Sequence, residues 1–302
     1  MEGRKRKMLS AASSPKRTDT KNNIQVPSSH LNSITCENNE ATSQKERSSY
    51  FKGDRNESRL GENFFNQPCI ALAKALLGKV LVRRCADGSE LRGRVVETEA
   101  YLGGEDKASH SAGGKRTERN TAMFMKPGTI YVYSIYGMHL CMNVSSQGEG
   151  TAVLLRSLEP LQGQPVMRQL RAQARRKATA RPLKEKELCN GPAKLCQALD
   201  IPRLFDRRDL ARDPDVWLET ESDDPGFKGS LDKPPRVEGT KTAEAGDRGE
   251  AAVVVVAASR VGIESRGEWA KKPWRFYLLG NQCVSVVDRA AERLALDGGH
   301  NE

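Results

Sequence analysis

The apolar and polar positions divide the chain near residue 60. Residues 1–60 are rich in Ser, Asn, Lys and Glu and contain few large apolar side chains. Such a segment buries too little apolar surface to offset the entropy lost on ordering, so we predict a disordered basic tail. From residue 61 to residue 302, short apolar runs alternate with turn residues, and this pattern predicts one folded domain.

In the predicted domain, segments with the period-two alternation of strands are more numerous than segments with a helical pattern. Strands are predicted where β-branched and aromatic residues alternate with polar ones, and helices where apolar residues recur every three or four positions. The predicted helices are 68–77, 164–177 and 192–199, and the predicted strands are 79–85, 90–99, 129–136, 139–146, 151–159, 251–258, 274–279 and 284–287. Asp87-Gly88, between the first two strands, is a two-residue hairpin signal. Short strands in mixed order with few helices favour an α+β fold with an antiparallel sheet.

Three segments depart from simple alternation. Residues 102–127 contain several Gly pairs and predict a long loop. Residues 219–250 are charged, rich in Gly and Pro and poor in large apolar residues, so we predict a flexible surface insertion. Residues 251–258 are apolar almost throughout, which predicts a buried strand.

Two acidic residues lie near the end of the predicted strand 90–99. Glu97 and Glu99 are two positions apart, so both point to one face of the sheet and Thr98 points to the other. A carboxylate in the position of Glu99 can take a proton from water. Arg156, the one charged residue within an apolar run, is its natural partner, and the alternative is a surface ion pair without a catalytic role. The pattern supports no role for Glu97.

Four tyrosines flank this strand in sequence: Tyr101, Tyr131, Tyr133 and Tyr136. Aromatic residues on strands more often fill a core or a cross-strand pair than bind a ligand, and Tyr131 and Tyr133 share one face, so at least one of them is expected to be structural. Tyr136 differs because it lies at the tip of a predicted hairpin, where there is little core to fill. An exposed aromatic side chain between basic loops suits insertion into a base stack.

The charge balance favours a polyanionic partner. The chain has 302 residues and a formal net charge of +10, with basic clusters at 4–7, 115–119 and 171–177. Nucleic acid is the partner that this balance favours, and the alternative is a soluble protein with a solvated positive surface. The cluster at 4–7 resembles a nuclear-localisation patch, although short basic runs also occur in solvated tails.

Other compositional features exclude several classes. No apolar run approaches the roughly 20 residues that cross a bilayer, and the N-terminus lacks the apolar core of a signal peptide. The seven cysteines form no CxxC pair, which predicts reduced thiols in an intracellular protein. GxxxxGK[ST], GxGxxG, HExxH and GxSxG motifs do not occur, and four scattered histidines are too few to predict a zinc site. Chemistry, if present, therefore falls to carboxylates.

Seven ordered segments resemble the alkyladenine type of 3-methyladenine DNA glycosylase. They are RGRVVETEAYLG (92–103), MFMKPGTIYVY (123–133), YGM (136–138), CMNVS (141–145), LLRSLEP (154–160), CNGPAKL (189–195) and WRFY (274–277). The resemblance extends from about residue 60 to 291 and excludes 219–250. It implies a compact single α+β domain with a curved antiparallel sheet, surrounding helices and a protruding β-hairpin that enters the minor groove of double-stranded DNA.

The resemblance also implies a reaction. A monofunctional DNA glycosylase of base excision repair would flip alkylated or deaminated purines out of duplex DNA, among them 3-methyladenine, 7-methylguanine, hypoxanthine and ethenoadenine. It would hydrolyse the N-glycosidic bond with a Glu-activated water, leave an abasic site, and need no metal or cofactor. We expect a monomer in the nucleus, with repair-protein partners bound through the tail. The alternative is a non-catalytic protein of the same fold that binds damaged DNA.

Site residues follow from the matching positions. The resemblance implies that Glu99 is the general base, with Arg156 holding the water, and that Tyr101, His110 and Tyr133 enclose the flipped base above Asn143, which disfavours guanine. It implies that Tyr136 fills the gap left in the duplex. The further DNA contacts expected are Met138 on the same hairpin and the phosphate-binding candidates Thr117, Arg119 and Lys194. His139 departs from the family, which usually has Tyr there.

Overall fold

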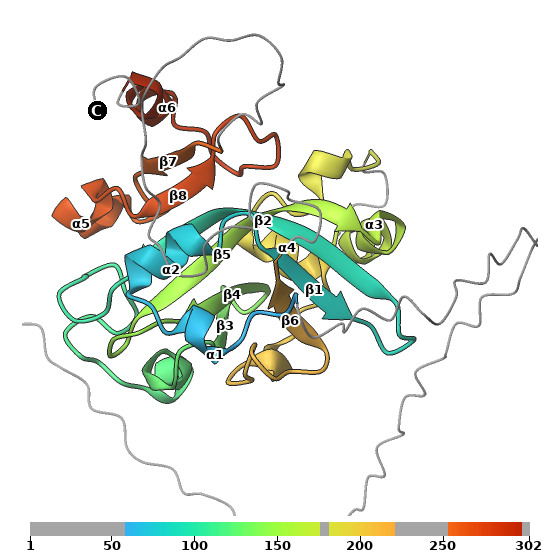
Figure 1. Cartoon of the computed structure of the whole chain (residues 1–302), viewed down its shortest axis with the longest axis horizontal. Coiled ribbons are helices and arrows are strands. Elements are labelled where there is room, and N and C mark those ends of the chain that lie inside the picture. Colours follow the sequence, from blue (N-terminus) through green and yellow to red (C-terminus); the bar gives the residue numbers. More distant parts are fainter. Residues whose placement is uncertain (1–57, 176–180, 221–252, 298–302) are drawn as a thin grey trace, which may run out of the picture. The chain divides into compact units, whose positions relative to one another are not determined.

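The computed structural model describes residues 58–175, 181–220 and 253–297 (Figure 1). Most of the predicted tail and the predicted insertion beyond residue 220 lie outside these ranges, so both remain predictions. The described fold already includes Leu60, which is buried and whose N–H donates to the Leu218 carbonyl at 2.8 Å. The described ranges therefore include the position near residue 60 where the sequence predicts the fold to begin.

An eight-stranded sheet, antiparallel at every pairing between its strands, forms the centre of the fold. Its strands are β1 Val80–Arg84, β2 Glu90–Tyr101, β3 Ile130–Ile135, β4 His139–Ser145, β5 Ala152–Gln162, β6 Val216–Glu219, β7 Val255–Ala258 and β8 Arg275–Leu278. The main order is β3-β4-β5-β2-β1-β6, with β8 on the C-terminal half of β2 and β7 beyond it. This arrangement confirms the predicted α+β fold with an antiparallel sheet.

Short helices surround the sheet. They are α1 Glu62–Phe65, α2 Cys69–Ala75, α3 Gln164–Gln173, α4 Pro192–Ala198, α5 Glu268–Lys271 and α6 Arg289–Asp297, with 3-10 turns η2 Glu118–Phe124, η3 Glu185–Glu187, η4 Arg203–Phe205 and η6 Glu264–Arg266. The main core joins α2 and α4 to one face of the sheet. A second cluster joins β7, β8 and α6, which lie together in orange and red in Figure 1.

The main core covers one face of the sheet and leaves the opposite face available for a functional site. Leu72 of α2 and Leu195 of α4 pack with Val132, Val153 and Leu155 of the sheet, and all five are fully buried. Burying each such side chain stabilises the fold by about 1.5–3 kcal/mol. Because side chains alternate along a strand, the intervening residues of β2, β3, β4 and β5 point to the opposite face.

Thr98 points to the core face, as the alternation predicts. Its hydroxyl is fully buried and donates to the Ala73 carbonyl of α2 at 2.8 Å. We expect Thr98→Val to lower the free energy of unfolding by about 1 kcal/mol, because it keeps the shape and removes one buried hydrogen bond. Urea unfolding measures this change, and Thr121→Val, whose hydroxyl is on an exposed turn, is the control. Equal stability of Thr98→Val and the unchanged protein would contradict the assignment.

Two strand predictions are wrong, one in its end point and one altogether. The strand 151–159 does not end before Pro160, because β5 continues and pairs Pro160 with Gly93 at a register shift, where the missing N–H is tolerated. The strand 284–287 is absent from the described fold. There the Ser285 N–H donates to Glu97 and the Val286 carbonyl accepts from Arg275, so side chains replace a neighbouring strand.

The predicted insertion and the strand after it also need correction. Glu219 belongs to β6, is buried and pairs with Val80, so the segment predicted as 219–250 does not begin at Glu219. Of the predicted strand 251–258, residues 251 and 252 lie outside the description and β7 covers 255–258. The side chains of β7 alternate between exposed and buried because only one face packs on the second cluster. Both β6 and α6 were missed in the sequence.

Candidate functional site

The strand register brings the site residues of four strands onto one face. Tyr131 pairs with Asn143, Asn143 with Leu154, and Leu154 with Glu99. Residues directly opposite each other in a sheet point to the same side, which here is the side opposite the main core. Residues two positions away, including Tyr133 on β3, point to that side as well.

Glu99 is fully buried near the end of β2 and both of its carboxylate oxygens are hydrogen-bonded. Oε1 accepts the Val261 N–H at 2.7 Å and lies 3.2 Å from Arg156 Nη1, while Oε2 accepts the Tyr101 hydroxyl at 2.8 Å. These donors compensate for the cost of burying a charge. We refer to these four residues as the Glu99 cluster.

Arg156 links the Glu99 cluster to a second buried carboxylate. Its Nε lies 3.3 Å from Glu97 Oε1 and its Nη2 donates to the Ser285 hydroxyl at 3.2 Å. Burial alone would lower the pKa of Arg156, but the carboxylates of Glu99 and Glu97 outweigh burial and raise it. Glu97 also binds Arg275 Nη1 at 3.0 Å. Glu97, for which the sequence supported no role, therefore anchors the Arg156 guanidinium that faces Glu99.

A group of aromatic rings lies beside this cluster. The His110 and Tyr133 rings meet edge to face with centroids 4.6 Å apart, and Tyr131 lies 5.3 Å from Tyr133. Burial raises the pKa of Tyr131 to about 12 and that of Tyr133 further, and burial with the Glu99 charge raises the pKa of Tyr101. All three phenols are therefore protonated at neutral pH, and the aromatic walls are uncharged.

His110 stays neutral although its ring is partly exposed. Burial of part of the ring lowers its pKa to about 4, and the positive charges of Arg119 and Arg266 act in the same direction. Its Nδ1 lies 2.9 Å from the Tyr131 hydroxyl. A neutral imidazole adds no positive charge to the group of aromatic rings.

We expect the His110 imidazole resonances in an NMR titration to stay at their neutral positions down to about pH 5. Between pH 6.5 and 4 the unfolded chain binds a proton at this residue that the folded chain excludes, so its contribution to stability decreases as the pH falls through that interval. Arg119→Gln should raise the midpoint because it removes one of the two charges. Assignment comes from the spectrum of His110→Gln, and a midpoint near 6.5 would contradict the expectation.

Two asparagines fix the backbone around these rings. Asn143, predicted for the pocket floor, is buried and its Nδ2 donates to the Tyr131 carbonyl at 3.0 Å. Asn120 was missed in the sequence, although its Nδ2 donates to the carbonyls of His110 and Lys115 at 3.0 and 2.8 Å. Its Oδ1 accepts the Thr117 N–H. A Thr followed three residues later by Asn is a capping pattern that could have identified it.

The β3–β4 hairpin presents an aromatic side chain to solvent. Tyr136 is 89% exposed and Met138 57% exposed at its tip, and His139 beside them is also exposed. Both central residues of the turn, Tyr136 and Gly137, have positive φ (52° and 70°), as a type I′ turn requires. A non-Gly residue held in this conformation with little burial is typical of a functional position.

The phosphate-contact candidates are exposed but do not form one group. Thr117 caps η2, and Arg119 donates to the Ser134 carbonyl at 3.2 Å with its guanidinium 5.3 Å from the Tyr133 ring. Lys194 lies on α4, outside the Glu99 cluster, and donates to Asn190 Oδ1 at 2.9 Å. The structure therefore brings Arg119, but not Lys194, next to the aromatic residues.

Sequence reasoning missed the residues that close the site behind Tyr101. Arg260 Nη1 donates to the Ala100 carbonyl at 2.9 Å, and its guanidinium pairs with Asp106. The following residue, Val261, supplies the N–H that binds Glu99. No local signal could identify these residues, because Arg260 and Asp106 are 154 positions apart and come into contact only when the chain has folded.

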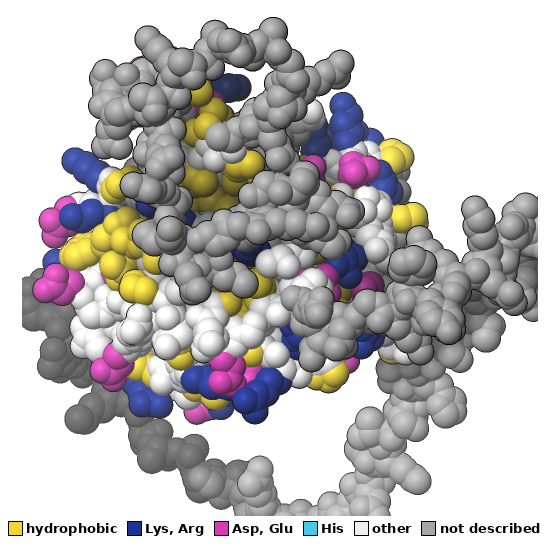
Figure 2. All heavy atoms as spheres, in the orientation of Figure 1, with side chains coloured by type: hydrophobic (Ala, Val, Ile, Leu, Met, Phe, Trp, Pro, Cys, Tyr) yellow, Lys and Arg dark blue, Asp and Glu magenta, His cyan; other side chains and the backbone are white. Residues whose placement is uncertain are grey.

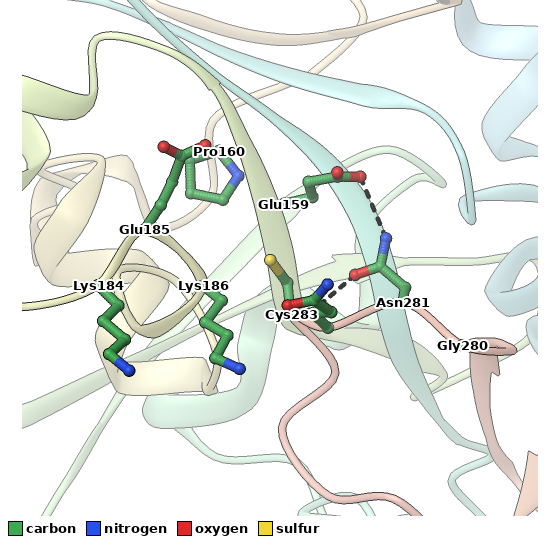
Figure 3. Close-up of a pocket in the computed structure, with 9 residues that line it drawn as sticks. Glu159, Pro160, Lys184, Glu185, Lys186, Gly280, Asn281 and Cys283 are labelled. Carbon is green, nitrogen blue, oxygen red and sulfur yellow. Dashed lines mark hydrogen bonds between the residues drawn. The ribbon is translucent and has the colours of Figure 1, made fainter.

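Other surface features lie apart from the Glu99 cluster. A hollow of about 600 Å³ is lined by Glu159, Lys184, Lys186 and Asn281 with five neighbours, none of which belongs to the cluster (Figure 3). Lys and Arg side chains are spread over the face shown in Figure 2, several of them beside Asp or Glu. Within the described ranges, no group of three metal-ligating side chains occurs, and no helix there is long and apolar enough to cross a membrane.

Comparison with known proteins covers most of the chain. The family model described as methylpurine-DNA glycosylase matches residues 63–282. A Mus musculus DNA-3-methyladenine glycosylase is 55% identical over 249 residues, which cover 82% of this chain and 68% of that protein. The Homo sapiens DNA-3-methyladenine glycosylase is 54% identical over 248 residues, covering 82% and 75%. A probable DNA-3-methyladenine glycosylase of Encephalitozoon cuniculi is 43% identical over 223 residues, covering 74% and 90%. The chain therefore belongs to the methylpurine-DNA glycosylase family.

Proposed function

We propose that this chain is a monofunctional DNA glycosylase that hydrolyses the N-glycosidic bond of alkylated and deaminated purines in duplex DNA. One observation carries the proposal beyond family membership. A buried carboxylate, Glu99, is held by three donors at the edge of a group of neutral aromatic side chains. A carboxylate fixed in this way can act as a base, and flat uncharged walls suit a purine.

The proposed reaction requires one proton transfer at Glu99. The carboxylate takes a proton from a water molecule as the water oxygen forms a bond to C1′ of the sugar. The bond from C1′ to the purine nitrogen breaks and its electron pair leaves with the base. A cationic alkylpurine leaves as a neutral base, whereas a neutral purine such as hypoxanthine needs a proton from a donor. The hydrolysis leaves an abasic site and an unbroken strand.

The second role of the site is to hold the base. In the proposal, Tyr101, Tyr133 and His110 enclose the flipped purine, and Asn143 lies at the pocket floor and disfavours the amino group of guanine. Electron-rich rings attract cationic bases such as 3-methyladenine and 7-methylguanine by about 0.5–2 kcal/mol. Hypoxanthine and ethenoadenine are the neutral lesions expected, because they stack on the same rings and pair poorly in the duplex.

Arg156 has a supporting role in the proposal. Its guanidinium contacts Glu99 and is held in turn by Glu97, so it can fix the orientation of the carboxylate and of the attacking water. The positive charge of Arg156 also compensates the negative charge of the second buried carboxylate, Glu97. Removing one partner of such a network leaves an uncompensated charge.

Tyr136 is proposed to occupy the space that the flipped nucleotide leaves. Its exposure at the hairpin tip supports this role, because an aromatic ring inserted between base pairs offsets part of the unstacking cost. Met138 is proposed to contact the DNA beside it. Thr117, Arg119 and Lys194 are proposed phosphate contacts, which would make binding salt-dependent.

Cellular context is also proposed. The net charge of +10 and the basic run at residues 4–7 support a nuclear protein that binds DNA. That run lies outside the described residues. We propose a monomer whose N-terminal tail binds other repair proteins.

The function is tested with a labelled duplex that carries a single hypoxanthine. We expect the strand to break only after alkali treatment, because the protein removes the base and leaves the backbone intact. The same assay with 7-methylguanine, 3-methyladenine and ethenoadenine defines the lesion range. Salt-dependent binding without release of any of these bases would support the alternative, a non-catalytic protein that binds damaged DNA.

A further inference from the structure

A buried ion pair lies against one face of the Tyr101 ring. The side chains of Arg260 and Asp106 are both 0% exposed, and two hydrogen bonds of 2.7 and 2.8 Å join them. The guanidinium carbon of Arg260 lies over the Tyr101 ring, 4.7 Å from its centroid, and also 5.1 Å from the Trp274 ring. Because Arg260 covers one face of Tyr101, a stacked base can use only the other face.

We propose that the Arg260–Asp106 pair sets the charge beneath Tyr101 and thereby determines how evenly the site accepts cationic and neutral purine lesions. The inference rests on the proposed function. In the proposed function, the purine stacks on Tyr101. The Arg260–Asp106 pair, whose two charges compensate each other, lies against the opposite face of the ring. The pair is therefore a specificity determinant that acts through Tyr101 without touching the base.

The chemistry of the two side chains makes the charge balance sensitive. The Arg260 guanidinium carries a positive charge, and its ion-pair partner within the described ranges is Asp106. Both oxygens of Asp106 already face Arg260, and they also accept the N–H groups of Leu102 and Ala108 at 3.1 Å. Asp106→Asn therefore leaves a net cation under Tyr101, whereas Arg260→Gln leaves a net anion.

The expected size of the effect follows from distance. A base stacked on the free face of Tyr101 would lie about 8 Å from the guanidinium, where one uncompensated charge changes the affinity for a cation on the order of tenfold. A neutral base in the same position feels little of this charge. The ratio of the two affinities therefore reports the charge beneath the ring.

The same pair also positions the cluster, and the ratio separates this effect from the charge. Arg260 holds the Ala100 carbonyl, and its neighbour Val261 donates to Glu99. A displaced Tyr101 would weaken binding in both single variants, and any change that it makes in the ratio would have the same direction in both. The charge effect has opposite directions in the two variants, and any difference in the folded fraction cancels because two lesions are compared on one protein preparation.

The test is equilibrium binding to two duplexes that differ only in the lesion, 7-methylguanine as the cation and ethenoadenine as the neutral base. A 2′-fluoro sugar at the lesion slows base loss during the measurement. We expect Asp106→Asn to weaken binding of the 7-methylguanine duplex about tenfold relative to the ethenoadenine duplex. Arg260→Gln should shift the ratio in the opposite direction, and the double variant should return it to within about threefold of the unchanged protein.

Asp213→Asn is the matched control. Asp213 is also a buried partner of an arginine, Arg208, but neither residue contacts Tyr101 or Glu99. Its loss should lower stability and leave the ratio unchanged. A ratio that stays constant in all variants, or moves in the same direction in both single variants, overturns the inference. If the unchanged protein binds neither lesion better than an undamaged duplex, the proposed function fails together with it.

Discussion

Glu99→Gln is expected to lower the rate of base release by about a thousandfold while leaving binding of damaged DNA nearly unchanged. The amide is close in shape to the carboxylate but cannot take a proton from water. Both oxygens of Glu99 accept hydrogen bonds from Tyr101 and Val261, and Arg156 contacts it. Single-turnover release of hypoxanthine measures the rate, and titration of the same duplex measures the affinity.

The design of this experiment separates chemistry from folding. Gln keeps one acceptor and turns an NH₂ group toward a donor, so some loss of stability is expected and thermal unfolding must show a folded protein at the assay temperature. Glu105→Gln, an exposed carboxylate on the loop after β2, is the matched control and should retain full activity. Unchanged base release by Glu99→Gln would remove Glu99 from the mechanism.

Tyr136→Ala is expected to slow excision from duplex DNA about tenfold to a hundredfold, because the unstacking cost of a flipped base is no longer offset. The side chain is 89% exposed, so its removal creates no cavity and should leave the unfolding temperature within error. Excision is measured in single turnover on duplex and on single-stranded DNA that contain the same lesion.

The single-stranded substrate is the internal control for this variant. A single strand has no partner bases to restack, so the rate of Tyr136→Ala on it should equal that of the unchanged protein. His139→Ala, three positions further along the hairpin and also exposed, tests whether loss of any large side chain has the same effect. Equal slowing on both substrates would place Tyr136 in base binding instead of duplex opening.

Local patterns in the sequence determined much of the fold. Alternation predicted strands at β1 to β5 and at β8, and Asp87-Gly88 lies in the turn between β1 and β2. The predicted two-residue loop is wrong, because the Cys85 N–H donates to the Ser89 carbonyl and the Gly88 N–H to the Cys85 carbonyl, so residues 86–88 form the loop and only Gly88 of the predicted pair has positive φ. Alternation also placed Glu97 and Glu99 on one side and Thr98 on the other, which the contacts of Arg156 and Thr98 confirm. These features depend on residues within a few positions of each other, so a single sequence is sufficient for them.

Family resemblance supplied what alternation could not. Composition and spacing alone left Glu99 and the tyrosines as an undefined aromatic-ligand site with several alternatives. The ordered match over most of the chain identified the family, and comparison with known proteins confirms that identification. The roles of Glu99, Tyr101, His110 and Tyr133 remain predictions that the proposed experiments test.

The tertiary structure alone decided how distant segments complete the site. The order of strands places β8 against β2, and this brings Arg275 to Glu97, while the segment after β7 brings Arg260 to Asp106 and Val261 to Glu99. The tertiary structure also shows that residues 284–287, predicted to form a strand, form a loop that binds Glu97. Local propensity contains no information on which distant charges meet. A buried carboxylate is stable only with such partners. The partners lie more than 150 positions away in the sequence, so tertiary packing determines which of them each carboxylate meets.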